Sequence, residues 1–113
     1  MRDKHSGIFE SPDDFFELDG NSVMLLSPPA AIAVCEMLSV RDVTVGRVEG
    51  GFWSHSKFEA RLDCIWDSPS YLSVNDVLET NGRAIDFIVT ETPRHNAFII
   101  TADLESDSAS SAA

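Results

Sequence analysis

The sequence predicts an α+β fold in which a mainly antiparallel sheet of about four strands has two helices packed on one face. The chain has 113 residues, enough for one domain with a single modest core, and 43% of them are hydrophobic, as in an ordinary globular protein. Apolar residues three and four positions apart occur in two segments, and alternating or short apolar runs occur in others. Their order, strand, helix, strand, strand, helix, strand, is typical of helices covering one side of a sheet.

The first expected strand is followed directly by a helix. Residues 23–26, VMLL, form a short apolar run typical of a strand. Ser27 and Pro28 then provide a helix start, because serine is a favoured N-cap residue and proline is favoured at the first helical position. We expect this helix to run to about Leu38, with an apolar face made of Ala31, Val34, Cys35 and Leu38.

Two strands are expected next, separated by a glycine turn. Residues 41–48 are rich in β-branched side chains, and the pair Gly50 and Gly51 should end that strand. Residues 58–66 alternate, the pattern of a strand with one face in the core and one in water. The expected core face comprises Phe58, Ala60, Leu62, Cys64 and Trp66. The expected outer face comprises Glu59, Arg61, Asp63 and Ile65.

The last two expected elements are a helix and an interior strand. Ser73 and Asp76 resemble a capping box, and the dipeptide Asn81-Gly82 then interrupts the pattern. Residues 83–91 are expected to be helical and to bury Ala84, Ile85, Ile88 and Val89. Residues 97–101, AFIIT, form a continuous apolar run and are therefore expected to be a strand inside the sheet.

Polar, acidic segments flank this pattern at both ends. Residues 1–22 hold six acidic and two basic residues, and we expect a weakly ordered acidic extension with one helical turn after Ser11-Pro12. Residues 105–113 have the composition of a disordered acidic tail. The expected organisation is therefore an extension over 1–22, an α+β domain over 23–104 and a tail over 105–113.

The net charge of −11 restricts the partners of the protein. Nineteen acidic residues against eight basic ones argue against direct binding of nucleic acid, because Lys and Arg contacts to phosphates supply most of that affinity. An acidic surface favours rapid association with a basic partner. Neither a hydrophobic leader nor an apolar run of membrane-spanning length occurs. We therefore expect a cytoplasmic protein with no membrane contact, in which Cys35 and Cys64 stay reduced.

Motifs for metal binding and catalysis are weak. The three histidines fall in expected loops or tails, and no C-x-x-C or H-x-x-x-H spacing occurs, so we expect no metal site and no cofactor. A small hydrolase using His55 with Asp63 or Glu59, and Ser54 as nucleophile, stays open as an alternative. It is the weaker hypothesis, because neither a nucleophile elbow nor a phosphate loop is present.

An acidic and aromatic surface is the remaining candidate for a functional site. The stretch VEGGFWSHSKFEARLDCIWD, residues 48–67, places Trp53 beside the glycine pair and charged residues at alternate positions. Tryptophan and arginine at the centre of a patch are typical of protein–protein hot spots, and acids around them suit a basic partner. Trp66 is in register with the apolar side of its strand and is expected to be core. An acidic adaptor that docks another basic protein would show the same pattern.

Six short motifs also carry a resemblance to a known family: LSPPAAIAVC, VEGGFW, Phe58, IWD, NGRAID and AFIIT. In this order, over residues 25–103, they resemble the immunity proteins of the tRNA-cutting E-type colicin, colicin E-five. The segment ARLDC differs from the family's more hydroxyl-rich strand, and the N-terminal segment is additional. These departures leave the cognate toxin open among colicins, contact-dependent inhibition toxins and other secreted effectors.

The resemblance implies a toxin inhibitor that is not an enzyme. Proteins of this family bind the basic ribonuclease domain that cuts tRNA anticodons, and they occupy its RNA site with carboxylates in place of phosphates. For this chain the resemblance implies an immunity-type domain over 23–104, with Gly50 and Gly51 as a structural turn. Together with the charge pattern, it leads us to expect these toxin-binding residues: Glu49, Trp53, Glu59, Arg61, Asp63 and Asp67.

Overall fold

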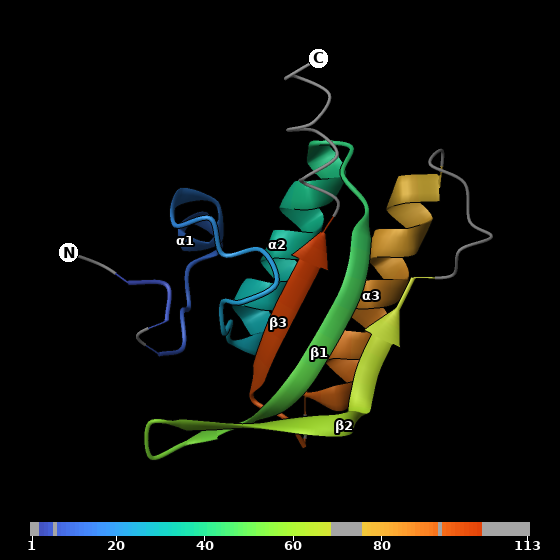
Figure 1. The fold of residues 1–113 in the computed structure, drawn as a ribbon. Coiled ribbons are helices and arrows are strands. Elements are labelled where there is room, and N and C mark those ends of the chain that lie inside the picture. Colours follow the sequence, from blue (N-terminus) through green and yellow to red (C-terminus); the bar gives the residue numbers. More distant parts are fainter. Residues whose placement is uncertain (1–2, 6, 69–75, 93, 103–113) are drawn as a thin grey trace.

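The computed structural model describes residues 3–5, 7–68, 76–92 and 94–102, and it confirms the α+β class. Its three-stranded antiparallel sheet has the strand order β2-β1-β3, fewer strands than expected (Figure 1). The elements are α1 (Pro12–Glu17), α2 (Pro28–Val40), β1 (Val45–Ser54), β2 (Lys57–Asp67), α3 (Val77–Glu91) and β3 (Ala97–Ala102). None of the described helices is long and apolar enough to cross a membrane.

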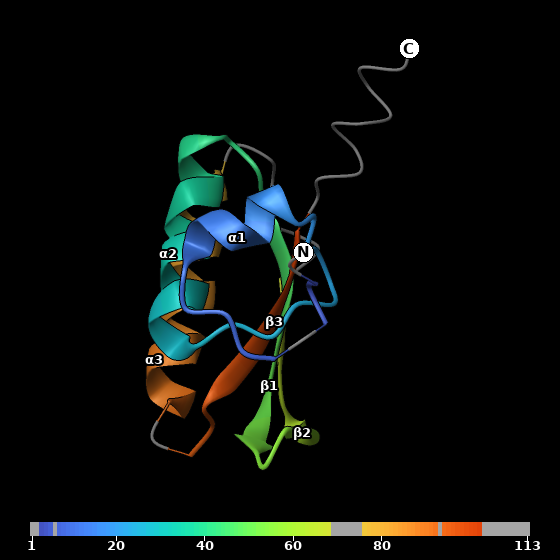
Figure 2. The same cartoon turned by 90° about the vertical axis from the view of Figure 1, so that its left-hand side faces the viewer.

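Helices α2 and α3 lie side by side on one face of the sheet, as the sequence predicts (Figures 1 and 2). The core between these layers is built from fully buried side chains, among them Leu38, Val48, Ile88, Phe98 and Ile100. Burial of one such side chain contributes about 1.5–3 kcal/mol.

The start of α2 is the one that the sequence predicts. Ser27 has an extended backbone, its hydroxyl oxygen accepts a hydrogen bond from the Ala30 amide at 3.4 Å, and Pro28 occupies the first helical position. The helix ends at Val40, where the amide of Arg41 donates to the carbonyls of Met37 and Leu38. This hydrogen bonding keeps residues 41–44 out of the sheet, so β1 begins at Val45 and not at residue 41.

The expected first strand at residues 23–26 is wrong in form. The Met24 amide donates to the Gly20 carbonyl at 3.0 Å and Ser22 has a left-handed backbone (φ 64°), so the chain is in a turn until shortly before Leu26. Leu26 then makes isolated bridges to Phe98 on β3 and to Phe9. Strand β3 is consequently an edge strand of the sheet, whose outer side is covered by this short segment.

The expected glycine turn is also wrong, because Gly50 and Gly51 lie inside β1. Their lack of a side chain allows a close approach of β2. A Cβ on Gly50 would clash with Cys64 Sγ and the Phe98 ring, and a Cβ on Gly51 would clash with the Glu59 carbonyl and the Phe58 ring. The glycines therefore serve packing, and the chain reverses four residues later.

Strand β2 is divided by a register shift that the alternating sequence does not reveal. Gly51 pairs with Ala60 and Glu49 pairs with Ile65, so residues 61–64 all stand opposite Gly50. Cys64, the last residue of this bulge, is buried, and beyond the bulge Trp66 packs against the core, as predicted. Ala60 and Leu62 are exposed, so the prediction that they face the core is wrong.

Helix α3 passes through Asn81-Gly82 without the expected interruption. The Asn81 side chain is fully buried: it donates to the Val43 carbonyl at 2.9 Å and accepts from the Val45 amide at 2.8 Å. These tertiary hydrogen bonds override the weak helix propensity of the dipeptide. The prediction that Val89 is buried is wrong, because its side chain is 55% exposed. Ser73, the first residue of the expected capping box, lies outside the described residues.

The N-terminal segment contributes to the same core. Phe9 and Phe15 are buried there, Phe15 from the short helix α1, and the Arg41 guanidinium lies 3.9 Å from the centre of the Phe16 ring. The division into extension, domain and tail stays a prediction, and the expected tail at 105–113 lies outside the described residues.

Candidate functional site

The β1–β2 hairpin projects beyond the helical layer and carries most of the expected binding residues (Figure 1). Its turn consists of His55 and Ser56, both with left-handed backbones (φ 51° and 63°), flanked by the paired residues Ser54 and Lys57. Two positive φ angles in a two-residue loop match the right-handed twist of the flanking strands. We call residues 52–63 the hairpin surface; they comprise the end of β1, the turn, the start of β2 and most of the bulge.

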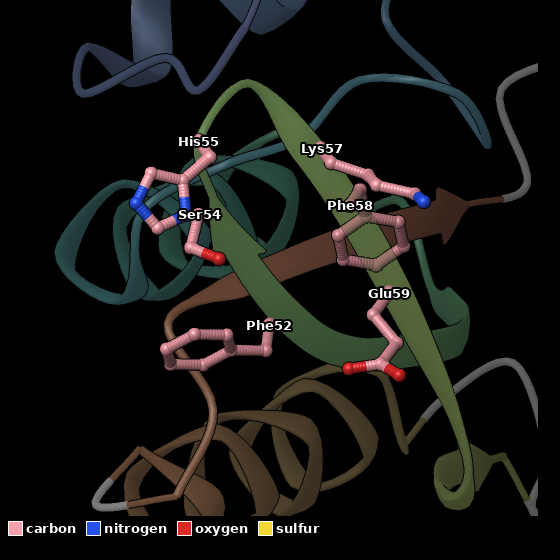
Figure 3. A pocket seen from close by; sticks show the side chains of 6 residues that line it. All are labelled: Phe52, Ser54, His55, Lys57, Phe58 and Glu59. Atoms are coloured by element: carbon pink, nitrogen blue, oxygen red, sulfur yellow. The ribbon is translucent and has the colours of Figure 1, made fainter.

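A surface pocket of about 310 Å³ lies at the twisted end of the hairpin (Figure 3). Phe52, Ser54 and His55 line it from one side, and Lys57, Phe58 and Glu59 line it from the other strand. Phe52 is 40% exposed, although a large aromatic side chain gains free energy from burial. Two aromatic rings beside a carboxylate can accept a side chain that is both apolar and positively charged.

Trp53 is held in place through its backbone. The Asn96 side chain accepts from the Trp53 amide at 2.7 Å and donates to the Trp53 carbonyl at 2.9 Å, which ties β1 to the start of β3. The indole is partly buried, and Gly7 of the N-terminal segment lies next to it. The backbone of Trp53, the expected anchor residue, is therefore fixed by hydrogen bonds, and only part of its indole ring is exposed.

The bulge of β2 displays Arg61, Leu62 and Asp63 to solvent. Arg61 Nη2 lies 3.2 Å from Glu59 Oε1, so these two expected site residues form an ion pair. Leu62 is 90% exposed. Asp63 has no ion-pair partner within the described parts of the chain, which leaves its carboxylate available to a partner molecule.

Glu49 and Asp67 lie apart from this group, on the face of the sheet away from the helices. Both are near Arg47: its guanidinium donates to Asp67 at 2.7 and 3.3 Å and lies 4.0 Å from Glu49. The hydrogen bond to Asp67 raises the pKa of Arg47, which stays charged. The two acids are thus already paired within the chain, a fact that sequence spacing could not show.

The residues considered for catalysis do not form a catalytic arrangement. His55 is exposed at the tip of the hairpin, and in the described structure no hydrogen bond joins it to Ser54, Glu59 or Asp63. A general base must reach the nucleophile and be oriented by a third group. The geometry therefore offers no support for a hydrolase.

Local ligand spacing does not predict one cluster of potential metal ligands that the described residues form. Cys64, Glu91 and His95 come from β2, the end of α3 and the loop after it, with their ligand atoms within 4.8 Å of one another. The only sequence signal is the E-x-x-x-H spacing of Glu91 and His95, because Cys64 is distant in the chain. The second cysteine, Cys35, is buried elsewhere, and burial raises the pKa of its thiol to about 12.

Comparisons with known proteins identify the family of the chain. The family model described as "Colicin-E5 Imm protein" matches residues 24–103. The chain is also 45% identical over 95 residues to the immunity protein CdiI of Burkholderia pseudomallei, a match covering 83% of this chain and 87% of that protein. The chain therefore belongs to the colicin-E5 immunity protein family, and it is a toxin inhibitor, not an enzyme.

Proposed function

We propose that the protein neutralises a tRNA anticodon nuclease by placing its hairpin surface in the RNA-binding site of the toxin's basic ribonuclease domain. The observation that carries this proposal is the exposure of large apolar side chains beside acids on one projecting hairpin. Leu62 is 90% exposed and Phe52 40% exposed. Exposed apolar side chains rimmed by charged ones mark interaction surfaces, and here they lie among the toxin-binding residues expected from the sequence.

Charge supports the choice of partner. With a net charge of −11 the protein attracts a basic domain over a distance that lengthens as the salt concentration falls, and the association rate should fall as the ionic strength rises. Asp63 is the acid best placed to stand in for a phosphate, because its carboxylate is exposed and no partner within the described chain neutralises it. We also propose a cytoplasmic location for the inhibitor, since the tRNA that such a nuclease would cut is there.

The other residues of the hairpin surface have distinct roles in this proposal. The pocket lined by Phe52, Phe58 and Glu59 accepts a basic side chain of the toxin, and its apolar walls exclude water from that contact. Arg61 fixes the register, since a cation within an acidic surface discriminates against a shifted arrangement. Glu49 and Asp67, which are paired with Arg47, form the outer rim.

Asp63→Ala and Trp53→Ala test the proposal. Each change is expected to weaken binding of the cognate toxin domain by about 2 kcal/mol, roughly thirtyfold in Kd, because a toxin group loses its partner on desolvation. Binding is measured by titration calorimetry, and neutralisation by the rate of tRNA cleavage at inhibitor concentrations close to the Kd of wild type. Circular dichroism and thermal unfolding establish that each variant is folded.

Asp86→Ala provides the matched control. It removes the same charge from an exposed position on α3, so the net charge equals that of Asp63→Ala while the hairpin surface is intact. The control should retain wild-type affinity. If Asp63→Ala and Trp53→Ala, singly and combined, bind as tightly as Asp86→Ala, the toxin contacts another face.

A further inference from the structure

The cluster of Cys64, Glu91 and His95 has a geometry that the hairpin surface does not explain. Cys64 is fully buried, the side chain of His95 is 10% exposed and that of Glu91 is 17% exposed. Glu91 is the last residue of α3 and His95 lies in the loop after it, while Cys64 is the last residue of the bulge in β2, where the strand returns to the core. Three different ligand types thus converge in a largely water-excluded position.

The distances between the ligand atoms fit a single small ion. His95 Nδ1 lies 3.4 Å from Glu91 Oε1, and Cys64 Sγ lies 3.9 Å from the same oxygen. Bond lengths of about 2.0–2.3 Å in tetrahedral zinc sites require ligand–ligand distances of about 3.3 Å for nitrogen to oxygen and about 3.5 Å for sulfur to oxygen. These two pairs therefore need changes of only a few tenths of an ångström, and the ligand atoms of all three residues already lie within 4.8 Å of one another.

We propose that Cys64, Glu91 and His95 bind a divalent transition-metal ion of the zinc class, with the fourth position open to water or a partner group. The set of one sulfur, one imidazole nitrogen and one carboxylate oxygen selects such an ion over Mg²⁺ or Ca²⁺, which require oxygen ligands. On binding, the Cys64 thiol loses its proton to solvent and ligates as thiolate, while His95 ligates as neutral imidazole.

The surrounding chain holds the ligands in place before an ion arrives. Gly50 has no side chain where Cys64 Sγ packs, and a Cβ there would clash with that sulfur. In the loop after α3 the His95 amide donates to the Glu91 carbonyl oxygen at 3.0 Å, and His95 Nδ1 lies 3.2 Å from the same oxygen, so the two residues are held close together. Arg94 Nη2 lies 3.5 Å from Glu91 Oε1, but its side chain is 74% exposed and can turn toward solvent when the carboxylate ligates.

The Cys64 thiol makes only a weak hydrogen bond within the described structure. Burial, followed by the charge of Glu91, raises the pKa of Cys64 to about 11, so without an ion the sulfur is a thiol. Its distance of 3.9 Å from the Glu91 carboxylate gives only a weak hydrogen bond. A bound ion would instead link the last residue of the bulge in β2, next to Asp63, to the end of α3.

Cobalt spectroscopy on the full-length protein, free of any affinity tag, tests the proposal. Co²⁺ titration should produce a thiolate-to-metal charge-transfer band in the near ultraviolet and intense visible bands of tetrahedral coordination, and Zn²⁺ should abolish both. Zn²⁺ should also raise Tm, because an ion that binds only the folded state stabilises it. The charge-transfer band should be absent from Cys64→Ala and present in Cys35→Ala, which removes the other buried thiol.

Two further variants keep the test decisive if Cys64→Ala does not fold. Glu91→Gln and His95→Gln should weaken Co²⁺ binding at least about tenfold, since even loss of a group that only supports a ligand costs that much. His55→Gln, a change of the exposed histidine in the turn, should bind Co²⁺ as wild type does. The proposal is overturned if wild type shows no thiolate band, if the band persists in Cys64→Ala, or if the Glu91 and His95 variants bind normally.

Discussion

Replacing Asn81 with alanine is expected to lower the free energy of unfolding by about 3–5 kcal/mol, the largest effect of any single change considered for this protein. The side chain is fully buried in α3 and donates to the Val43 carbonyl and the Ser39 hydroxyl, at 2.9 and 3.0 Å. It also accepts from the Val45 amide at 2.8 Å. Alanine leaves the backbone groups buried without partners, and each costs about 1–3 kcal/mol.

Chemical denaturation of wild type, Asn81→Ala and Gly82→Ala measures this effect. Gly82 is the matched control, because it is the next residue in the same helix and a Cβ on it would meet no atom within 4 Å. Gly82→Ala should stabilise the protein by about 0.5–1 kcal/mol through the higher helix propensity of alanine. If Asn81→Ala costs less than about 1 kcal/mol, the hydrogen bonds of Asn81 do not hold α3 to the segment before β1.

Gly51→Ala is expected to destabilise the protein by about 3 kcal/mol and to weaken toxin binding at the same time. A Cβ at this position would clash with the Glu59 carbonyl oxygen and with the Phe58 ring of the adjacent strand. The carbonyl belongs to the backbone next to Ala60, the residue with which Gly51 pairs, so it can move only by separating the strands. That movement would also displace the walls of the hairpin pocket.

Gly46→Ala, in the same strand, separates close packing from a general effect of glycine replacement. A Cβ on Gly46 would lie 3.6 Å from the Thr101 carbonyl oxygen, an ordinary contact distance. The free energy of unfolding of Gly46→Ala should stay within about 0.5 kcal/mol of the wild-type value. Equal stability of the two glycine variants in a thermal unfolding series would show that the β1–β2 hairpin adjusts freely at Gly51.

Local sequence determined the parts of the fold that depend on neighbouring residues. Ser27 and Pro28 begin α2 where the capping rules place a helix start. The residues that misled the prediction act through distant partners. Gly50 and Gly51 have no local mark distinguishing a turn from close strand packing, and the fold uses them for packing. Asn81 is helical because its side chain bonds residues near 40 positions away.

The candidate site was predictable in outline only. An alternating strand implies constant register, and the bulge opposite Gly50 breaks that register, which moves Leu62 from the expected core to full exposure. Trp53 was expected from its sequence neighbours, but the hydrogen bonds that position it come from Asn96. Glu49 and Asp67 are paired with Arg47 and are therefore not free acids. The sequence does not show this pairing, because it depends on the folded arrangement of the two strands.

Amide hydrogen exchange of the inhibitor, alone and saturated with its cognate toxin domain, tests most directly whether the hairpin surface is the contact face. Peptides covering residues 52–63 should exchange more slowly in the complex, while those covering the outer sides of α2 and α3 should not change. A second apolar surface makes the comparison informative, because a groove of about 280 Å³ between these helices includes the exposed Val40 and Leu78. Protection confined to that groove, with unchanged exchange over residues 52–63, would contradict the proposed mode of inhibition.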